Sequence, residues 1–368
     1  MSAQPLTQRA LNRATLARQL LLERSTMPVP AAVEHLVGLQ AQTPHTWYVG
    51  LWARLADLDA ASVGAMLVDR GLVRIALMRS TIHLVTAPDA LRLREVMQPV
   101  LVRSFSGQFG KHLVGVDQEE LAAAGRRILE EQPMMFSQLG RALAEHFPGR
   151  DEASLAQAIR ARVPLVQVPP RGVWGASGLA AHTTLDSWLA GQTELTIALD
   201  DLVLRYLGAF GPATVKDIQA WSGLTRLREV TDRLGDRLVR LHHTDGHELL
   251  DLPDAPRPNP GAPAPVRFLY DYDNLLLSHA DRSRFGGQAD VEGLYSEHGP
   301  VPGPVLVDGL LRAGWRLTRS RADATLVVRT SRPMPAATED AVVQEGRALL
   351  DFLAPDASTR DVSVRPVE

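Results

Sequence analysis

The sequence predicts an α+β protein in which three tandem winged-helix units precede a small C-terminal β-barrel domain. Two observations support this prediction: a pattern of three helices followed by a β-hairpin occurs about three times, and short strands follow a proline-rich segment at 251–266. With 368 residues, the chain is also too long for one ordinary core. The predicted domains are 1–110, 111–196, 197–258 and 259–368.

The first unit reads as several amphipathic helices and a hairpin. The prolines of the second helix fit a first helical turn, Thr43 is a suitable N-cap with Pro44 at the first helical position, and Gly71 is a suitable stop. β-Branched residues then indicate a hairpin with a break near Arg79 and Ser80. The expected helices are 6–24, 28–42, 43–55 and 59–71, and the expected hairpin is 73–86.

The third unit has the clearest signals for helix ends and turns. Its helices end at glycines, and a Thr-Asp-Gly turn joins two strands, which is a strong hairpin signal. The expected helices are 200–214, 214–223 and 224–236, followed by a hairpin at 238–252. The second unit repeats this order with weaker signals. Its expected elements are helices at 117–131, 136–147 and 152–163 and a strand-and-turn region at 164–175.

Beyond the proline-rich segment the pattern changes to short strands with Gly and Pro turns. Strands are expected within 266–279, 302–319 and 324–333, which suggests a small barrel or sheet. A late helix at 336–355 and a closing strand at 359–368 complete the prediction.

The composition excludes several classes of protein. The chain is 45% hydrophobic and 22% charged, as soluble globular proteins are, and its lack of cysteine excludes disulfides, thiolate metal sites and a cysteine nucleophile. It has no apolar run of membrane-spanning length and no recognisable signal peptide. We therefore expect a cytoplasmic protein that does not contact a membrane.

The basic residues are almost all arginine. Lys111 and Lys216 are the two lysines among 39 basic residues, and the net charge is −3. Guanidinium groups suit phosphates and base edges well, although a GC-rich genome also explains the bias. A net charge near zero does not exclude DNA binding, because a local basic patch suffices.

Familiar catalytic motifs are missing from the sequence. There is no P-loop, no GxGxxG after a strand, no GxSxG elbow, no HExxH helix and no evident pair of catalytic carboxylates. His242, His243 and His247 lie close together, so a metal site is conceivable. The simpler interpretation is that they are exposed residues of the third wing, and we expect no metal and no cofactor.

Two stretches remain as candidates for chemistry. Arg282 and Arg284 would share one face of an extended chain and could grip phosphates; the alternative is a solvated loop. Gln40 and Gln42 flank Ala41 at a predicted helix end before Pro44, and only such a break lets residues two apart on a helix converge. The alternative is that the two amides cap backbone groups at the helix junction.

The sequence resembles the AlkZ-like family of tandem winged-helix DNA glycosylases over most of its length. The matching pieces are "HLVGLQAQTPHTWYVGLWARL", "MRSTIHLVTAPDA", "WSGLTRL", "YDNLLLSHADRSRF" and "VLVDGLLRAGWR". Together these pieces are specific, although each alone is weak. The resemblance implies a C-shaped arrangement of three winged-helix units with a small β-barrel domain.

The resemblance also implies an activity. The family's Gln-apolar-Gln motif falls on Gln40, Ala41 and Gln42, which makes the two glutamines the expected catalytic residues. Family members hydrolyse the N-glycosidic bond of N7-alkylated guanine and unhook azinomycin interstrand crosslinks. A glutamine at the second position favours the azinomycin-resistance branch over the relatives with aspartate there.

We therefore predict a monofunctional DNA glycosylase of repair or self-resistance, which acts as a monomer on double-stranded DNA with alkylated or crosslinked guanine. The residues expected to contact or anchor DNA are His45, Trp47, Arg79, His83, His279, Arg282 and Arg284. A rival interpretation is a winged-helix regulator that binds DNA without chemistry. It requires a basic recognition helix, and residues 224–236 carry three arginines against three carboxylates.

Overall fold

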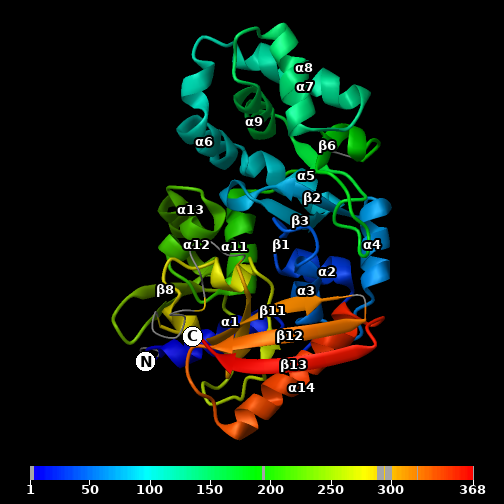
Figure 1. Cartoon of the computed structure of the whole chain (residues 1–368). Coiled ribbons are helices and arrows are strands. Elements are labelled where there is room, and N and C mark those ends of the chain that lie inside the picture. The colour runs from blue at the N-terminus through cyan, green and yellow to red at the C-terminus, as the bar shows by residue number, and fades with distance from the viewer. Residues whose placement is uncertain (1–3, 193–194, 288–293, 295–300, 321, 368) are drawn as a thin grey trace.

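The computed structural model describes residues 4–192, 195–287, 294, 301–320 and 322–367, and it shows a mixed α+β fold (Figure 1). Residues 118–184 lie at one end of the molecule, and residues 303–366 lie at the other. Residues 29–86 lie between these two ends, so the segment with the two candidate glutamines is central.

The first segment begins with α1 (Gln8–Arg18), which ends before Leu20 takes a positive φ of 57°. The helix is therefore shorter than the predicted 6–24. A run of helix, strand, helix, helix, strand and strand follows. It consists of α2 (Val29–His35), β1 (Leu39–Gln40), α3 (Trp47–Trp52), α4 (Ala60–Val68), β2 (Leu72–Ala76) and β3 (Ile82–Thr86).

The predicted helix at 28–42 is wrong in its second half. Helix α2 ends at His35, because Val37 and Gly38 adopt left-handed φ values of 55° and 85°. A Cβ on Gly38 would lie 2.7 Å from Val85 Cγ1, so glycine also allows a close approach to β3. The chain then continues as strand β1, which places Gln40 on a sheet rather than in a last helical turn.

The second segment contains the same order of elements after two connecting helices, α5 (Ala87–Val96) and α6 (Gln98–Gln108). Strands β2 and β5 pair across the two runs, so both share one six-stranded sheet in the order β1-β3-β2-β5-β6-β4. The last strand lies beyond the expected 164–175 region. The run consists of α7 (Gln118–Glu131), β4 (Met134–Met135), α8 (Phe136–His146), α9 (Glu152–Arg162), β5 (Leu165–Gln167) and β6 (Ala181–Thr184).

The third segment shows three helices followed by a hairpin, as the sequence predicts. Gly246, in the Thr-Asp-Gly turn, has a φ of 91°, and an isolated bridge joins Ala213 to Leu250 beside the hairpin. The elements are α11 (Leu199–Phe210), α12 (Val215–Ser222), α13 (Leu227–Leu234), β7 (Val239–His242) and β8 (Glu248–Asp251).

The C-terminal strands form an open sheet over the described residues, so the prediction of a closed barrel is corrected. The order is β13-β12-β11-β10-β9, with β13 and β9 at the two edges. Strands β12 and β13 run parallel, which requires a crossover, and α14 provides it while covering one face. The elements are β9 (Arg267–Phe268), β10 (Gly303–Val307), β11 (Leu310–Arg319), β12 (Asp323–Thr330), α14 (Ala336–Leu353) and β13 (Thr359–Pro366).

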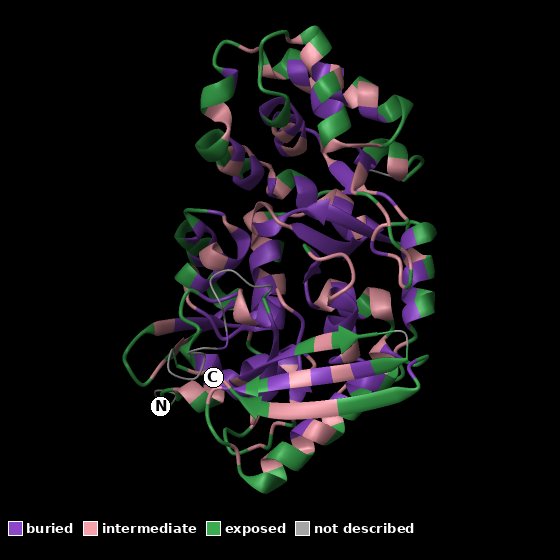
Figure 2. Ribbon diagram, in the orientation of Figure 1, coloured by how far each residue is buried: buried purple, intermediate pink, exposed green. Residues whose placement is uncertain are grey.

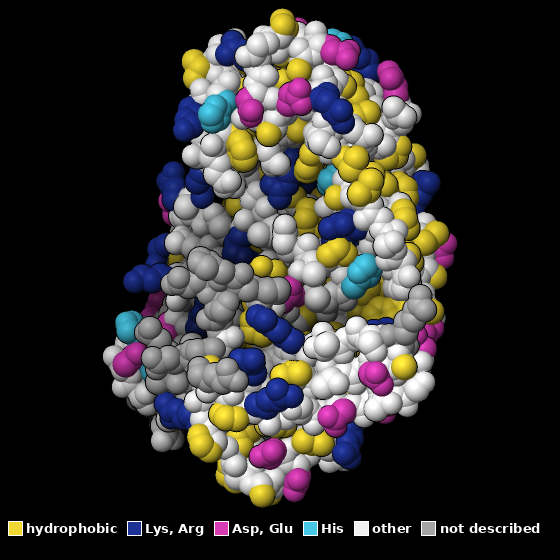
Figure 3. Space-filling model, in the orientation of Figure 1, with side chains coloured by type: hydrophobic (Ala, Val, Ile, Leu, Met, Phe, Trp, Pro, Cys, Tyr) yellow, Lys and Arg dark blue, Asp and Glu magenta, His cyan; other side chains and the backbone are white. Residues whose placement is uncertain are grey.

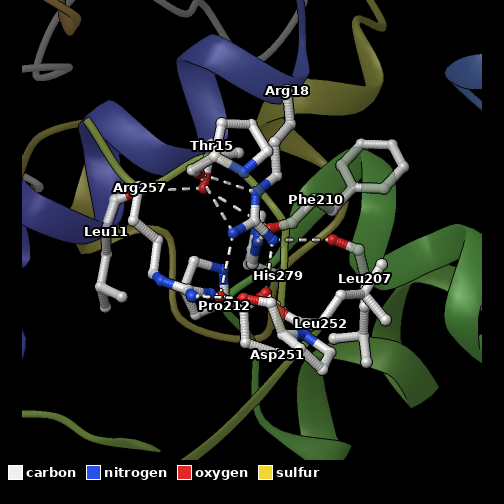
Figure 4. Close-up of polar contacts among 12 residues, drawn as sticks. Leu11, Thr15, Arg18, Leu207, Phe210, Pro212, Asp251, Leu252, Arg257 and His279 are labelled. Carbon is white, nitrogen blue, oxygen red and sulfur yellow. Dashed lines mark hydrogen bonds and ion pairs between the residues drawn. The ribbon is translucent and has the colours of Figure 1, made fainter. Parts of the chain in front are cut away.

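Buried residues concentrate where these segments meet (Figure 2), and several of them are charged. Arg18 on α1 donates to both carboxylate oxygens of Asp251 on β8, at 2.6 and 3.0 Å (Figure 4). Arg54 after α3 binds Asp273 in the same two-pronged way, at 2.7 and 2.8 Å. These buried pairs fasten α1 and α3 to segments more than 200 residues away in sequence.

Candidate active site

Gln40 and Gln42 lie on one short segment at the end of strand β1. Gln40 pairs with His83 of β3, and the Ala41 amide donates to the Ile82 carbonyl oxygen at 2.7 Å. Strand β1 ends at Gln40, and Gln42 follows in a bend. Both side chains are bound by the β2–β3 hairpin, so the hairpin, rather than a break in a helix, brings them together.

The two glutamines differ in exposure. The Gln40 side chain is buried, with 4% of the residue exposed, and its Oε1 accepts a hydrogen bond from Arg79 Nη2 at 2.6 Å. Gln42 is exposed, and its Oε1 accepts from the Ile82 amide at 3.2 Å. Each amide oxygen has a second lone pair, so each can accept another hydrogen bond, for example from a water. Neither glutamine caps a helix, so the capping interpretation is wrong.

Arg79 lies at the tip of the β2–β3 hairpin, in the short 3₁₀ turn η1 (Met78–Ser80). It has a left-handed φ of 54° and its neighbour Ser80 has one of 58°, which costs about 1–3 kcal/mol per residue. Beyond Gln40, its guanidinium donates to Trp221 O at 2.6 Å and Asn274 Oδ1 at 3.2 Å. Burial lowers the pKa of Arg79 to about 10, so it is a cation at neutral pH.

Residues 271–274, which follow β9, bind the chain on both sides of the glutamine motif. Asp271 accepts hydrogen bonds from the Thr43 and Thr46 hydroxyls at 2.6 and 2.5 Å, and Asn274 Nδ2 donates to Gly38 O at 3.2 Å. Thr43 thus binds Asp271 and is not the N-cap of α3, which starts at Trp47. Asp271 and Asn274 are not among the residues predicted from sequence, which came from the basic end of the same stretch, Arg282 and Arg284. The polar run 270–274, at the end of an apolar strand, was the signal for them.

Arg74 holds the motif through the backbone of Ala41, a role that no sequence pattern indicates. It lies on β2 with 1% of the residue exposed, and its Nη2 donates to Ala41 O at 2.7 Å. Burial lowers the pKa of Arg74 to about 10. The residue between the two glutamines is therefore fixed by β3 on its amide side and by Arg74 on its carbonyl side.

Four of the predicted DNA-binding residues are buried, so their side chains lie beneath the surface of this structure, and their contact with DNA stays a prediction. Burial lowers the pKa of His83 to about 3, helped by the nearby Arg79 cation, which keeps the ring neutral. His279 packs against the ring of Phe210 inside the third segment (Figure 4), and burial holds its pKa well below the usual range. The exposed fractions are 0% for Trp47 and His83, 2% for His279 and 5% for Arg284.

Arg282 and Arg284 do not share a face. A 3₁₀ turn, η5 (Ser283–Phe285), replaces the expected extended chain and turns the two side chains apart. Arg284 points inward and donates to Thr15 Oγ1 at 3.1 Å and to Pro212 O at 3.0 Å. Arg282 is exposed, and its charge lowers the pKa of Arg79, so it remains a candidate for a phosphate contact near the motif.

His45 lies two residues beyond Thr43 and is half-buried. Its Nε2 lies 3.1 Å from Val173 O, and burial lowers its pKa. The ring is therefore mainly neutral at pH 7 and still partly accessible. Its predicted contact with DNA stays a prediction.

The histidines of the third wing show no sign of a metal centre. His243 and His247 both contact Asp245, at 2.8 and 2.9 Å, while His242 is exposed on β7. Within the described ranges, no group of three or more His, Asp or Glu side chains has the arrangement of a metal site. The part of the chain that the structure describes also has no helix of sufficient length and apolar character to cross a membrane.

The arrangement can orient a water molecule by neutral groups. Two amide oxygens lie against one hairpin, each held by a protein donor, and the Arg79 cation binds Gln40 Oε1. Such a site can accept hydrogen bonds from a water and present fixed dipoles to a developing charge. Figure 3 shows Lys and Arg side chains at several points along the middle of the visible face, as a polyanionic ligand would require.

Comparisons with known proteins show similarity to DNA glycosylases. The model of a family described as "DNA glycosylase AlkZ-like" matches residues 33–352. An interstrand DNA cross-link repair glycosylase from Streptomyces sahachiroi is 25% identical over 353 residues, which cover 90% of this chain and 94% of that relative. The solved structure of the Streptomyces sahachiroi DNA glycosylase AlkZ has a TM-score of 0.78 at 20% identity, with 98% of this chain and 100% of that chain covered.

Proposed function

Because this chain belongs to the AlkZ-like family of DNA glycosylases, we propose that it hydrolyses the N-glycosidic bond of N7-alkylguanine in duplex DNA and unhooks interstrand crosslinks of that type, including those of azinomycin. The observation that carries the proposal is the placement of Gln40 and Gln42. Their amide oxygens lie against the same β2–β3 hairpin, and each is oriented by a protein donor.

Neutral amides suffice for this reaction because the substrate is already activated. Alkylation at N7 leaves a positive charge on the base, so protonation of the leaving group, elsewhere worth ~10²–10⁴-fold, is not required. What remains is to place a water below C1′ and to stabilise an oxocarbenium-like sugar. A site without a catalytic carboxylate is specific for such cationic leaving groups.

We assign different roles to the two glutamines. Gln42 is exposed and is the group that accepts a hydrogen bond from the attacking water. Gln40 is buried and its Oε1 is held by Arg79, so it is a positioning residue that fixes the strand end next to Gln42 and maintains the shape of the site. An amide forms no Schiff base with the sugar, so the product is an abasic site and the enzyme is monofunctional.

The fold supports a duplex substrate. The three runs at 29–86, 118–184 and 199–251 have the helix and strand order of winged-helix units, and we interpret them as tandem DNA-gripping modules. A crosslinked base is tethered to the opposite strand and does not swing fully into a pocket. An open concave surface formed by these units suits that substrate, and the protein acts as a monomer in the bacterial cytoplasm.

The rival function, DNA-binding regulation without chemistry, has less support. The arginines of its candidate recognition helix α13 are engaged with carboxylates, which leaves them less available to phosphates. Arg226 lies 2.8 Å from Glu229, and Arg228 lies 3.0 Å from Glu248.

The decisive experiment is single-turnover release of N7-methylguanine from a defined duplex, followed by the same assay on an azinomycin-crosslinked duplex scored for abasic product. We expect Gln42→Ala and Gln40→Ala each to lower the rate constant by ~10²-fold, as loss of one aimed dipole does. A double Ala variant with full activity would disprove the catalytic assignment. Tight binding to an unmodified palindrome without base release would favour the regulator.

A further inference from the structure

A cavity of about 250 Å³ lies beside the tip of the β2–β3 hairpin, between α6 and α9. Arg79, Ser80 and Thr81 form its border on the hairpin side, and Arg160 borders it on α9. The same tip holds the catalytic motif, because Arg79 binds Gln40 and Ile82, next to Thr81, binds Gln42. The cavity is therefore a direct neighbour of the proposed reaction centre.

The lining of the cavity has the character of an anion site. Two arginines, three residues with hydroxyl groups and two glutamines line it, and no Asp or Glu is among the described residues that do so. Arg160 Nη1 and Nη2 donate to Ser80 Oγ and Ser80 O at 3.1 and 2.5 Å, which leaves further N–H donors for a ligand. Within the described part of the chain no carboxylate pairs with Arg160, and burial lowers its pKa.

The backbone at the tip of the β2–β3 hairpin is strained. Arg79 and Ser80 both have positive φ values, and neither is a glycine. Such strain points to a requirement for those side chains at that place. The Arg79 side chain binds Gln40, and Ser80 accepts hydrogen bonds from Arg160 at its hydroxyl and its carbonyl oxygen.

From these observations we infer that the cavity binds a backbone phosphate of the DNA strand next to the damaged nucleotide. This inference rests on the proposed function, since it supplies the phosphate contact that the glutamine site lacks. Two guanidinium groups with neutral hydroxyls and amides suit a phosphodiester. Holding that phosphate at the hairpin tip sets the distance from the neighbouring sugar to Gln42.

The test places a negative charge in the cavity without touching either arginine. Gln157→Glu on α9 and Gln108→Glu at the end of α6 change opposite walls, and Gln108 is exposed, so the fold tolerates the change. Gln132→Glu, at the exposed end of α7 and outside the cavity lining, adds the same charge as the matched control.

The half-saturating enzyme concentration for N7-methylguanine release is measured on a duplex with a single lesion. We expect each cavity variant to raise it about tenfold, while the control leaves it unchanged. The duplex is then made with one uncharged methylphosphonate at a time on either side of the lesion. At one methylphosphonate position, the half-saturating concentrations of the variant and of the unmodified protein should become equal, because the phosphate charge that the new glutamate repels has been removed.

Two results would overturn the inference: equal half-saturation for variant and unmodified protein on the normal duplex, or a penalty that persists at every methylphosphonate position. If the protein releases no base at all, the proposed function fails, but the cavity is still tested by equilibrium binding to plain duplex. There the plot of log affinity against log salt should become shallower by about 0.9 in Gln157→Glu, the loss of one phosphate contact. An unchanged slope would count against the cavity alone.

Discussion

Arg79 Nη2 donates a hydrogen bond of 2.6 Å to Gln40 Oε1, from the tip of a hairpin to the strand beside it. This bond decides which end of the Gln40 amide faces the protein, because a guanidinium has only donors. It also places a cation behind the amide oxygen, which polarises the dipole. The two residues form a unit, in which Arg79 fixes the position of the buried Gln40.

Replacing Arg79 should slow the chemical step. We expect Arg79→Gln to lower the single-turnover rate constant by ~10–100-fold, because a loosened Gln40 loses its alignment. Arg79→Lys, which keeps the charge but not the fork, should recover only part of the loss. Arg127→Gln, on the exposed face of α7, is the control. If Arg79→Gln and Gln40→Ala have fully additive effects, the two residues do not act as a unit.

Removing one partner of the buried Arg54–Asp273 pair should destabilise the whole protein. Asp273→Asn leaves the Arg54 guanidinium buried beside a neutral group, and we expect a loss of about 3–5 kcal/mol in the free energy of unfolding. Asp201→Asn breaks an exposed pair with Arg237 and should cost no more than about 1 kcal/mol. Urea unfolding monitored by circular dichroism measures both. Equal losses would contradict the assignment of Arg54–Asp273 as a buried structural pair.

Mild acid should destabilise the fold through three buried histidines. Burial lowers the pKa of His83 to about 3 and that of His182 to about 4, and it holds that of His279 well below its usual range. The unfolded chain binds these protons near pH 6.5, so stability is present above that pH and is lost as the pH falls toward the folded-state pKa values. Each histidine should cost roughly 2 kcal/mol between pH 7 and pH 5.

The measurement is urea unfolding at pH 7 and at pH 5, where most carboxylates remain ionised. His83→Gln should lose about 2 kcal/mol less than the unmodified protein over this interval, whatever its stability at pH 7. A stability that is the same at both pH values would show that these rings are not held neutral.

Gly38 offers a test of how β1 is placed. Gly38→Ala combines a φ of 85° with a Cβ 2.7 Å from Val85 Cγ1, so we expect a loss of about 3 kcal/mol together with slower base release. Gly149→Ala has a similar φ of 77° with no atom within 4 Å, and should cost only about 1 kcal/mol. Equal stability and activity in both variants would show that the close approach to β3 is unimportant.

The sequence predicted much of the fold because its local signals were strong. The hairpin at the third wing and the break at Arg79 and Ser80 follow from turn chemistry. The end of α2 was missed, because Val37 in a left-handed conformation is a tertiary outcome that no propensity indicates. The predicted C-terminal barrel is an open sheet over the described residues. The sequence does not show this, since strand order depends on pairings between distant segments.

The candidate site was predictable only in part. Gln40 and Gln42 were found because a motif carries them, but their surroundings depend on contacts that sequence spacing does not show. His83 and Arg284 were assigned to DNA for their chemistry, and burial removes them from the surface. Arg74, on strand β2, and Asn274, in the 3₁₀ turn η4 (Asn274–Leu276), went unnoticed, because the role of a single polar residue beside apolar ones is not evident until its partner is known.

The contacts of the hairpin tip join residues that leave the ribosome far apart in time. Arg79 bonds to Trp221 and Asn274, which follow it by 142 and 195 positions, and Ser80 bonds to Arg160, which follows by 80. Contacts of such separation form late, after their intervening loops have closed. A nascent chain therefore carries Gln40 and Gln42 long before the contacts around them are complete. A chain cut short before Arg160 would bear the motif without these contacts.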